Sequence, residues 1–215
     1  SVLTGLVKMR HRIQQSRMGW LSRLDRLKEA NQDESPDAAI CRKWAGAALV
    51  YERKLDADIA VVVREHQMWR YLAGVKGIGP VIGAKLLTSI DITKADTVAA
   101  LWRFAGLAVI DGRAERHQRG VKSHFSQNLK AEMYVVAVSL LRCRSPYTAI
   151  YRDAKMVYAV RHPDWTDGHV NAAARRKMLK TLLLHLWLTW RRVEGLPTPP
   201  RRIPSEYGWT EVKGG

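Results

Sequence analysis

Apolar residues recur at intervals of three and four over most of this 215-residue chain, and this spacing constrains the fold more than any other feature. Such spacing places apolar side chains on one face of an α-helix. The first stretch spans residues 2–30 and the second spans residues 37–72, with a polar, proline-closed segment at 31–36 between them. Two long helices joined by a short polar segment predict an antiparallel, coiled-coil-like helical hairpin.

This hairpin is interpreted as a spacer or as an arm through which the chain forms a homo-oligomer. A catalytic role is not expected for it, because no pair of carboxylates faces one side. Asp56, Asp58 and Glu65 are expected to be solvated.

The same spacing predicts further helices at residues 98–105, 127–144, 147–161 and 172–193. Thr97 or Asp96 suits the cap of the first of these, and Ser126 suits the cap of the second. Neither a strand-rich region nor an internal repeat is visible, although residues 108–110 have the composition of a short strand. The predicted fold class is therefore mainly α. The expected domains are a helical hairpin or coiled-coil arm at 1–70, a helical domain containing a helix-hairpin-helix motif at 71–195, and an extended tail at 196–215.

The helix-hairpin-helix prediction rests on residues 70–88. Gly77 and Gly79 flank Ile78 and are followed by Pro80. Glycine takes positive φ without steric cost, and proline suits the first position of a helix. A helix start exposes unpaired N–H groups and the positive end of the helix dipole, so it attracts phosphate. This is the pattern of sequence-independent DNA-binding proteins. The alternative is a Gly-Pro turn that only joins two packed helices.

The charge of the chain favours a polyanionic partner. The formal net charge is +16, from 36 Lys and Arg against 20 Asp and Glu. This excess is larger than solubility requires. Because apolar residues make up 47% of the chain, a disordered basic tail is excluded. An anionic membrane surface would also attract such a charge, but no apolar segment is long enough to span a bilayer, so no membrane partner is expected.

The two cysteines and the chain ends bear on location. Cys41 and Cys143 have no metal-binding or redox spacing, which favours a reducing compartment. No secretory signal is visible, so a cytoplasmic, nucleoid-associated location is expected. The first residue is Ser1 and not Met, so a longer parent chain is considered.

A basic loop at residues 111–124 is a second candidate contact site, with a turn signal at Asp111 and Gly112. The loop either contacts nucleic acid or forms a basic surface, and its position soon after the proposed phosphate-binding turn favours contact. The candidate nucleic-acid-binding residues are Lys76, Gly77, Ile78, Gly79, Gly83 and Lys85 in the turn region, and Arg113, Arg116, His117, Arg119 and Lys122 in the loop.

Other clusters of chemically active residues are interpreted more simply. His162, Asp164 and His169 match no structural zinc spacing, so a loop packed around Trp165 is favoured and no metal site is assigned. Trp187 and Trp190 are expected in the core because they lie on an apolar helical stripe. The basic runs at 175–177, 191–192 and 201–202 either follow phosphates or are solvated.

Two segments carry a resemblance to a known family. They are residues 77–87 (Gly-Ile-Gly-Pro-Val-Ile-Gly-Ala-Lys-Leu-Leu) and 101–107 (Leu-Trp-Arg-Phe-Ala-Gly-Leu). Residues 75–190 thereby resemble the C-terminal domain of the DEDD-type insertion-sequence transposases, the one-ten and one-one-six group, whose relatives include the Piv-type DNA invertases. The predicted hairpin resembles the coiled-coil spacer of those proteins. The resemblance implies mobile-element DNA recombination, with DNA as the partner and a structured guide RNA as a further partner.

The chain departs from the family pattern in two respects. The RuvC-like domain with its four metal-binding carboxylates is absent from these residues, so no cofactor is expected in this chain, and Mg²⁺ is implied only if such a domain accompanies it. The family also has a nucleophilic serine a few residues after its Gly-Leu pair, where this chain has Ala114. The nearby serines are Ser123 and Ser126, of which Ser126 fits better as a helix cap.

Three hypotheses follow. The first is a transposase-related protein that grips DNA, or an RNA–DNA complex, by backbone phosphates. The second is a recombinase fragment that uses Ser123 or Ser126 as a nucleophile together with a separate carboxylate domain. The third is a structural subunit of a ribonucleoprotein.

Overall fold

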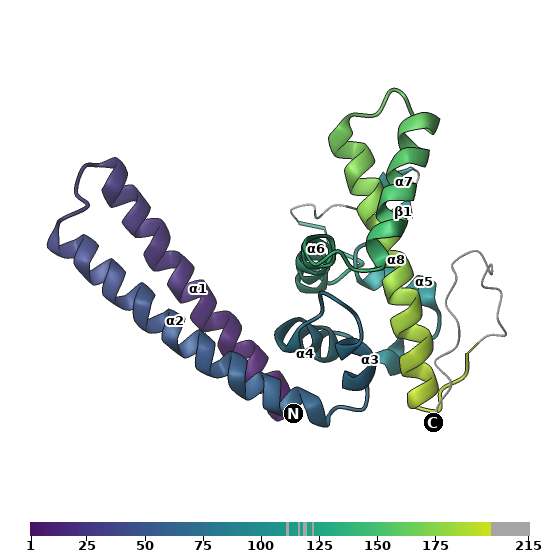
Figure 1. Ribbon diagram of the computed structural model, residues 1–215, viewed down its shortest axis with the longest axis horizontal. Helices are drawn as coiled ribbons and strands as arrows, with labels where there is room; N and C mark the ends of the chain where they lie inside the picture. Colours follow the sequence, from purple (N-terminus) through teal and green to yellow (C-terminus); the bar gives the residue numbers. More distant parts are fainter. Residues whose placement is uncertain (111, 116, 118–119, 122, 199–215) are drawn as a thin grey trace.

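The computed structural model describes residues 1–198 except 111, 116, 118–119 and 122, and it confirms a mainly helical fold (Figure 1). The side chain of Arg113 also lies outside this description. Two long helices, α1 (Val2–Glu29) and α2 (Pro36–Val62), open the chain. The following elements are the 3₁₀ turn η1 (Val63–Glu65), α3 (Trp69–Ala73), α4 (Pro80–Ser89), the 3₁₀ turn η2 (Ile92–Lys94), α5 (Val98–Phe104), the strands β1 (Val109–Ile110) and β2 (Arg113–Ala114), α6 (Gln127–Arg142), α7 (Tyr147–Arg161) and α8 (Asp167–Val193).

Helices α1 and α2 form the predicted antiparallel hairpin, here called the arm, which projects away from the other helices (Figure 1). Ser35 and Pro36 start α2, and the Ser35 side chain accepts a hydrogen bond from the Ala38 N–H. At the opposite end of the arm, Leu3 and Ile59 are buried in the same core cluster as residues of α3 to α8, which are here called the body. The base of the arm is therefore part of the main core.

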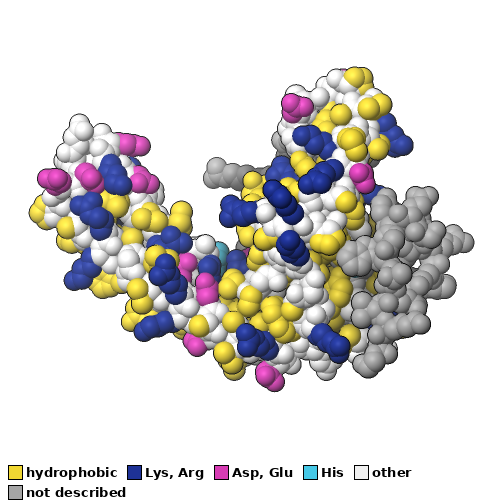
Figure 2. Space-filling view, in the orientation of Figure 1, with side chains coloured by type: hydrophobic (Ala, Val, Ile, Leu, Met, Phe, Trp, Pro, Cys, Tyr) yellow, Lys and Arg dark blue, Asp and Glu magenta, His cyan; other side chains and the backbone are white. Residues whose placement is uncertain are grey.

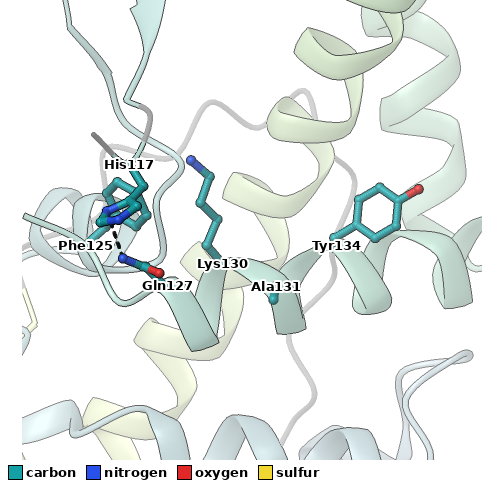
Figure 3. A pocket seen from close by; sticks show the side chains of 6 residues that line it. All are labelled: His117, Phe125, Gln127, Lys130, Ala131 and Tyr134. Atoms are coloured by element: carbon teal, nitrogen blue, oxygen red, sulfur yellow. Dashed lines mark hydrogen bonds between the residues drawn. The ribbon is translucent and has the colours of Figure 1, made fainter. Parts of the chain in front are cut away.

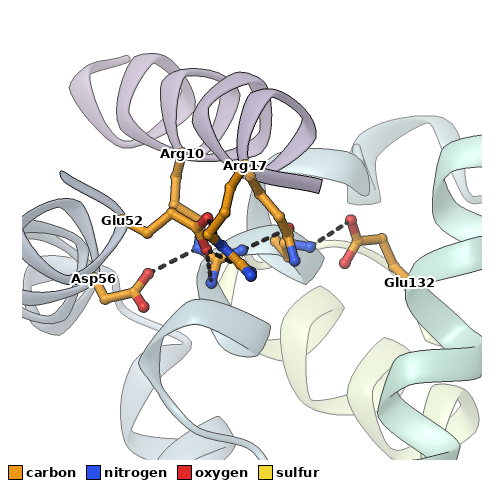
Figure 4. Close-up of polar contacts among 7 residues, drawn as sticks. Arg10, Arg17, Glu52, Asp56 and Glu132 are labelled. Carbon is orange, nitrogen blue, oxygen red and sulfur yellow. Dashed lines mark hydrogen bonds and ion pairs between the residues drawn. The ribbon is translucent and has the colours of Figure 1, made fainter. Parts of the chain in front are cut away.

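A buried carboxylate holds the two helices of the arm together (Figure 4). Glu52 of α2 is 3% exposed and accepts a hydrogen bond from Arg17 Nε of α1 at 2.5 Å. Arg10 of α1 lies 3.6 Å from the other Glu52 oxygen and donates to Asp56 at 2.8 Å. Asp56, expected from the sequence to be solvated, therefore has a cationic partner as well, and its side chain is 36% exposed. A carboxylate as deeply buried as Glu52 requires such cationic partners.

The second long helix ends at Val62, about ten residues earlier than its spacing predicts. His66 adopts an extended conformation, and its Nδ1 accepts the Met68 N–H at 3.2 Å, so the chain turns there. After this turn, Met68 and Leu72 are both fully buried. Burial of these side chains, together with the weak helix preference of the β-branched run 61–63, outweighs continuation of the helix.

The main core is formed around α8 and the helices packed on it. Trp187 is 1% exposed and its Nε1 donates to the Ala95 carbonyl, and Trp190 is 4% exposed, which confirms both as core residues. Arg191 is 4% exposed, donates to the carbonyls of Ala95 and Pro197, and lies over the Trp187 ring. It therefore fixes the packing of α8 and is neither solvated nor open to phosphate.

Helices α7 and α8 form a second, shorter hairpin (Figure 1). Helix α8 begins at Asp167, earlier than predicted, because the Thr166 side chain accepts the His169 N–H and caps it. The Trp165 ring lies between His162, with centroids 4.0 Å apart, and His169, at 3.9 Å. This stacking confirms the predicted packing around Trp165.

Neither a membrane-spanning helix nor a cluster of metal ligands is found among the described residues. Within the described part of the chain, no helix combines the length and apolarity needed to cross a bilayer. In the same part, no three His, Cys, Asp or Glu side chains gather as metal ligands do. The predicted extended tail, with Arg201 and Arg202, lies outside the described residues from residue 199 onward.

Candidate nucleic-acid interface

The turn between α3 and α4 fits closely against α6. Gly77 has a φ of +102°, and its carbonyl accepts a hydrogen bond from Ser139 Oγ at 2.7 Å. A Cβ atom on Gly77 would lie 3.2 Å from Leu140 Cα. Gly79 instead has an extended conformation, with φ −82° and ψ 175°. Only Gly77 thus uses the conformational freedom that the sequence predicts for both glycines.

The N-terminus of α4 is open. Pro80 occupies the first turn of the helix, as predicted, and Gly79 before it is exposed. The next two N–H groups, of Val81 and Ile82, have no acceptor within the helix. No side chain of the described residues caps this end. With the exposed Lys76 nearby in the turn, the helix end has the properties of an anion site.

Three other predicted contact residues have structural partners. Ile78 is 5% exposed and lies in the main core. Gly83 is buried, and a Cβ there would meet the Trp69 ring at 2.9 Å, so it allows α3 and α4 to approach. Lys85 forms an ion pair of 3.0 Å with Glu132 of α6, and its side chain is 13% exposed. Their contact with nucleic acid stays a prediction.

The basic loop starts with a small hairpin. Strand β1 pairs with β2 in antiparallel register, Val109 opposite Ala114, and Gly112 in the turn has a φ of +74°. A short strand at this position agrees with the sequence prediction. Arg116, Arg119 and Lys122, and the side chain of Arg113, lie outside the described residues, so the structure does not place these four predicted contacts.

His117 links the described part of the loop to the start of α6. Its Nδ1 lies 3.0 Å from Ser123 Oγ and 2.9 Å from Gln127 Nε2. A histidine beside a hydroxyl is the arrangement in which a base activates a nucleophile. Ser126, in contrast, caps α6 by accepting the Leu129 N–H at 3.2 Å, as predicted. A nucleophilic role for either serine stays a prediction, which a covalent protein–DNA adduct would test.

One face of α6 forms an open pocket that sequence reasoning missed (Figure 3). Gln127, Lys130, Ala131 and Tyr134 follow one another at intervals of three, one and three, which places them on one side of the helix. Together with His117 and Phe125 they line a pocket of about 400 Å³, here called the α6 pocket. The helical spacing of these residues is the feature of the sequence from which this face could be predicted.

Positive charge gathers beside the α6 pocket. Lys130 Nζ lies 4.3 Å from the centre of the Phe125 ring, and the Arg175 guanidinium of α8 lies 5.4 Å from that of Tyr134. Farther along α8, burial and then the positive charges of Arg176 and Lys177 lower the pKa of Lys180. Cations that repel one another in this way are stabilised by a polyanion.

The whole molecule is hollowed between the arm and the body, and Lys and Arg side chains are visible on both sides of the hollow (Figure 2). Helix α6 connects the two candidate contact sites in the body. Gly77 meets it near Leu140, whereas the α6 pocket is centred near Lys130. At a rise of 1.5 Å per residue, these two points of α6 lie about 15 Å apart along the helix.

Comparison with known proteins finds a match in the middle of the chain. Residues 70–152 match the family model described as Transposase IS116/IS110/IS902 family. Residues 70–152 are similar to this transposase family and are here called the transposase-family segment. The match confirms the resemblance seen in the sequence. No curated protein and no solved structure matches the chain.

The transposase-family segment contains the features from which the candidate interface is built. It includes the α3–α4 turn, the basic loop and all of α6, with Lys130 and Tyr134. The arm and α8 lie outside the matched residues. Arg175 therefore comes to the α6 pocket from outside the segment.

Proposed function

We propose that this transposase-related chain binds duplex DNA, alone or within an RNA–DNA complex, through backbone phosphates during mobile-element recombination. The observation that carries the proposal is the open N-terminus of α4 beside the exposed Lys76, inside the transposase-family segment. Backbone N–H groups at a helix start bind phosphate without reading sequence. Contacts of this kind position a protein on DNA and make its affinity depend on salt.

The electrostatics support the same proposal. The net charge of +16 attracts any polyanion over a distance. Arg175 beside Tyr134, and the mutually repelling cations farther along α8, offer further phosphate contacts. The proposal also includes a structured RNA as a further partner, self-association through the arm, and a nucleoid-associated location. These parts rest on the family resemblance and on the hairpin form of the arm.

The experiment is a salt titration of duplex affinity. Fluorescence anisotropy of a labelled 30-base-pair duplex is measured at several salt concentrations for the wild type and Lys76→Glu. Loss of one phosphate contact is expected to lower the slope of log K against log salt by about 1 and to weaken binding about tenfold at low salt. Lys43→Glu on the arm, also an exposed lysine, reverses the same charge away from the turn and controls for net charge.

Two outcomes would contradict the proposal. Equal loss in Lys76→Glu and Lys43→Glu would show that only overall charge matters and that α4 has no site. A chain that binds one discrete RNA and no duplex DNA would support the structural ribonucleoprotein subunit instead.

A further inference from the structure

We infer that the α6 pocket holds an unpaired nucleobase of a single-stranded segment of DNA, stacked on Tyr134. This inference rests on the proposed function, because it names the form of nucleic acid that this part of the interface takes. In the two contact regions predicted from the sequence, the turn and the loop, the expected contacts are with phosphates only. The α6 pocket differs from both in offering an aromatic ring together with hydrogen-bonding side chains.

Tyr134 supplies the stacking surface. The residue is 59% exposed, although an exposed aromatic ring keeps a large apolar area in water. The Arg175 guanidinium lies 5.4 Å from the ring centre, and a cation in this position also attracts the phosphate of a nucleotide stacked there. Aromatic side chains exposed beside cations are the features with which proteins bind single strands without sequence preference.

The rest of the α6 pocket fits a base in shape and chemistry. Ala131 has a short side chain and leaves space between the longer side chains of Lys130 and Tyr134 (Figure 3). Gln127 and His117, which hydrogen-bond to each other at 2.9 Å, stand on the other side and can exchange that bond for one to a base edge. The volume of about 400 Å³ lies within the range of small-ligand sites.

An unpaired base fits this pocket better than a duplex does. In a duplex the faces of the bases are covered by their neighbours, so a side chain meets only base edges and the backbone. Strands that are opened or displaced expose those faces, and recognition then uses stacking. The inferred site therefore complements the phosphate contacts at α4 and does not duplicate them.

The experiment uses the full chain and two probes of one sequence. One is a 12-nucleotide single strand with a central 2-aminopurine, and the other is its blunt duplex. Affinity is followed by anisotropy, and stacking by the loss of 2-aminopurine fluorescence. The wild type is expected to quench the single-stranded probe. Tyr134→Leu is expected to weaken single-strand binding by about 5- to 150-fold, to abolish the quenching, and to change duplex affinity less than about twofold.

Tyr51→Leu is the matched control. Tyr51 on the arm is also 59% exposed and also has a cation, Lys54, over its ring. This variant should bind and quench as the wild type does. Tyr134→Phe keeps the ring and should retain both affinity and quenching. The retained duplex affinity of Tyr134→Leu shows that this variant is folded.

The outcomes separate this inference from the proposed function. Duplex binding without quenching of the single strand, or unchanged single-strand binding in Tyr134→Leu, would overturn the inference and leave the proposed function standing. Failure of the wild type to bind either probe would overturn both. An equal loss in Tyr134→Leu and Tyr51→Leu would show that a general change in surface, and not this pocket, is responsible.

Discussion

Replacing Glu52 with Ala is expected to lower the free energy of unfolding by about 3 kcal/mol. Glu52 is 3% exposed and is shared by Arg10 and Arg17, so its removal leaves the partly buried Arg17 guanidinium without a carboxylate and Arg10 with Asp56 alone. The hydrogen bond from Arg17 to Glu52 raises the pKa of Arg17 in the wild type. A guanidinium stays charged even without that partner, so Arg17 cannot relieve the loss by deprotonation. Urea unfolding followed by circular dichroism measures the change.

The control for this prediction is an ion pair of the same arm that lies in water. Arg42 and Asp33 approach to 2.9 Å, and their side chains are 45% and 53% exposed. Asp33→Ala is therefore expected to cost less than about 1 kcal/mol. If Glu52→Ala and Asp33→Ala destabilise the chain equally, the buried carboxylate does not hold the arm together.

Replacing Gly77 with Ala is expected to destabilise the chain by about 2 kcal/mol or more. Alanine at a φ of +102° is strained, and its Cβ would lie only 3.2 Å from the backbone of α6 at Leu140 and Ser139. Backbone atoms cannot move aside as the end of a flexible side chain can. The α3–α4 turn must then separate from α6, and the melting temperature measured by calorimetry should fall.

Gly19→Ala is the matched control, with the opposite expected sign. Gly19 lies within α1, and a Cβ there would have no atom within 4 Å. Alanine is a better helix former than glycine, so this variant should be more stable by up to about 1 kcal/mol. A Gly77→Ala variant that melts at the wild-type temperature would show that the turn does not pack against α6 as described.

Features set by local rules could be predicted from the sequence. The hairpin of the arm follows from apolar spacing, and the cap of α6 at Ser126 and the start of α4 at Pro80 follow from side-chain and ring geometry. The positive φ of Gly77 belongs to the same class. Each depends on residues only a few positions apart, so no knowledge of the tertiary structure was needed.

Features that depend on distant parts of the chain could not be predicted in this way. The end of α2 at Val62 depends on burial of Met68 in a core completed by later helices. Lys85 resembles a free cation until α6 brings Glu132 within 3.0 Å. The α6 pocket also requires His117 and Phe125 to come together with a helix face. Spacing along the sequence predicts which residues share one face of a helix, but not which residues of other elements lie opposite that face.

The open N-terminus of α4 is tested most directly by measuring the duplex affinity of Gly79→Asp. Gly79 already has the extended conformation of a helix cap, and a Cβ there meets nothing within 4 Å, so aspartate fits and its carboxylate occupies the N–H groups in place of a phosphate. We predict unchanged or slightly higher stability together with at least about tenfold weaker duplex binding at low salt. A folded Gly79→Asp chain that binds duplex DNA as tightly as the wild type would contradict the account.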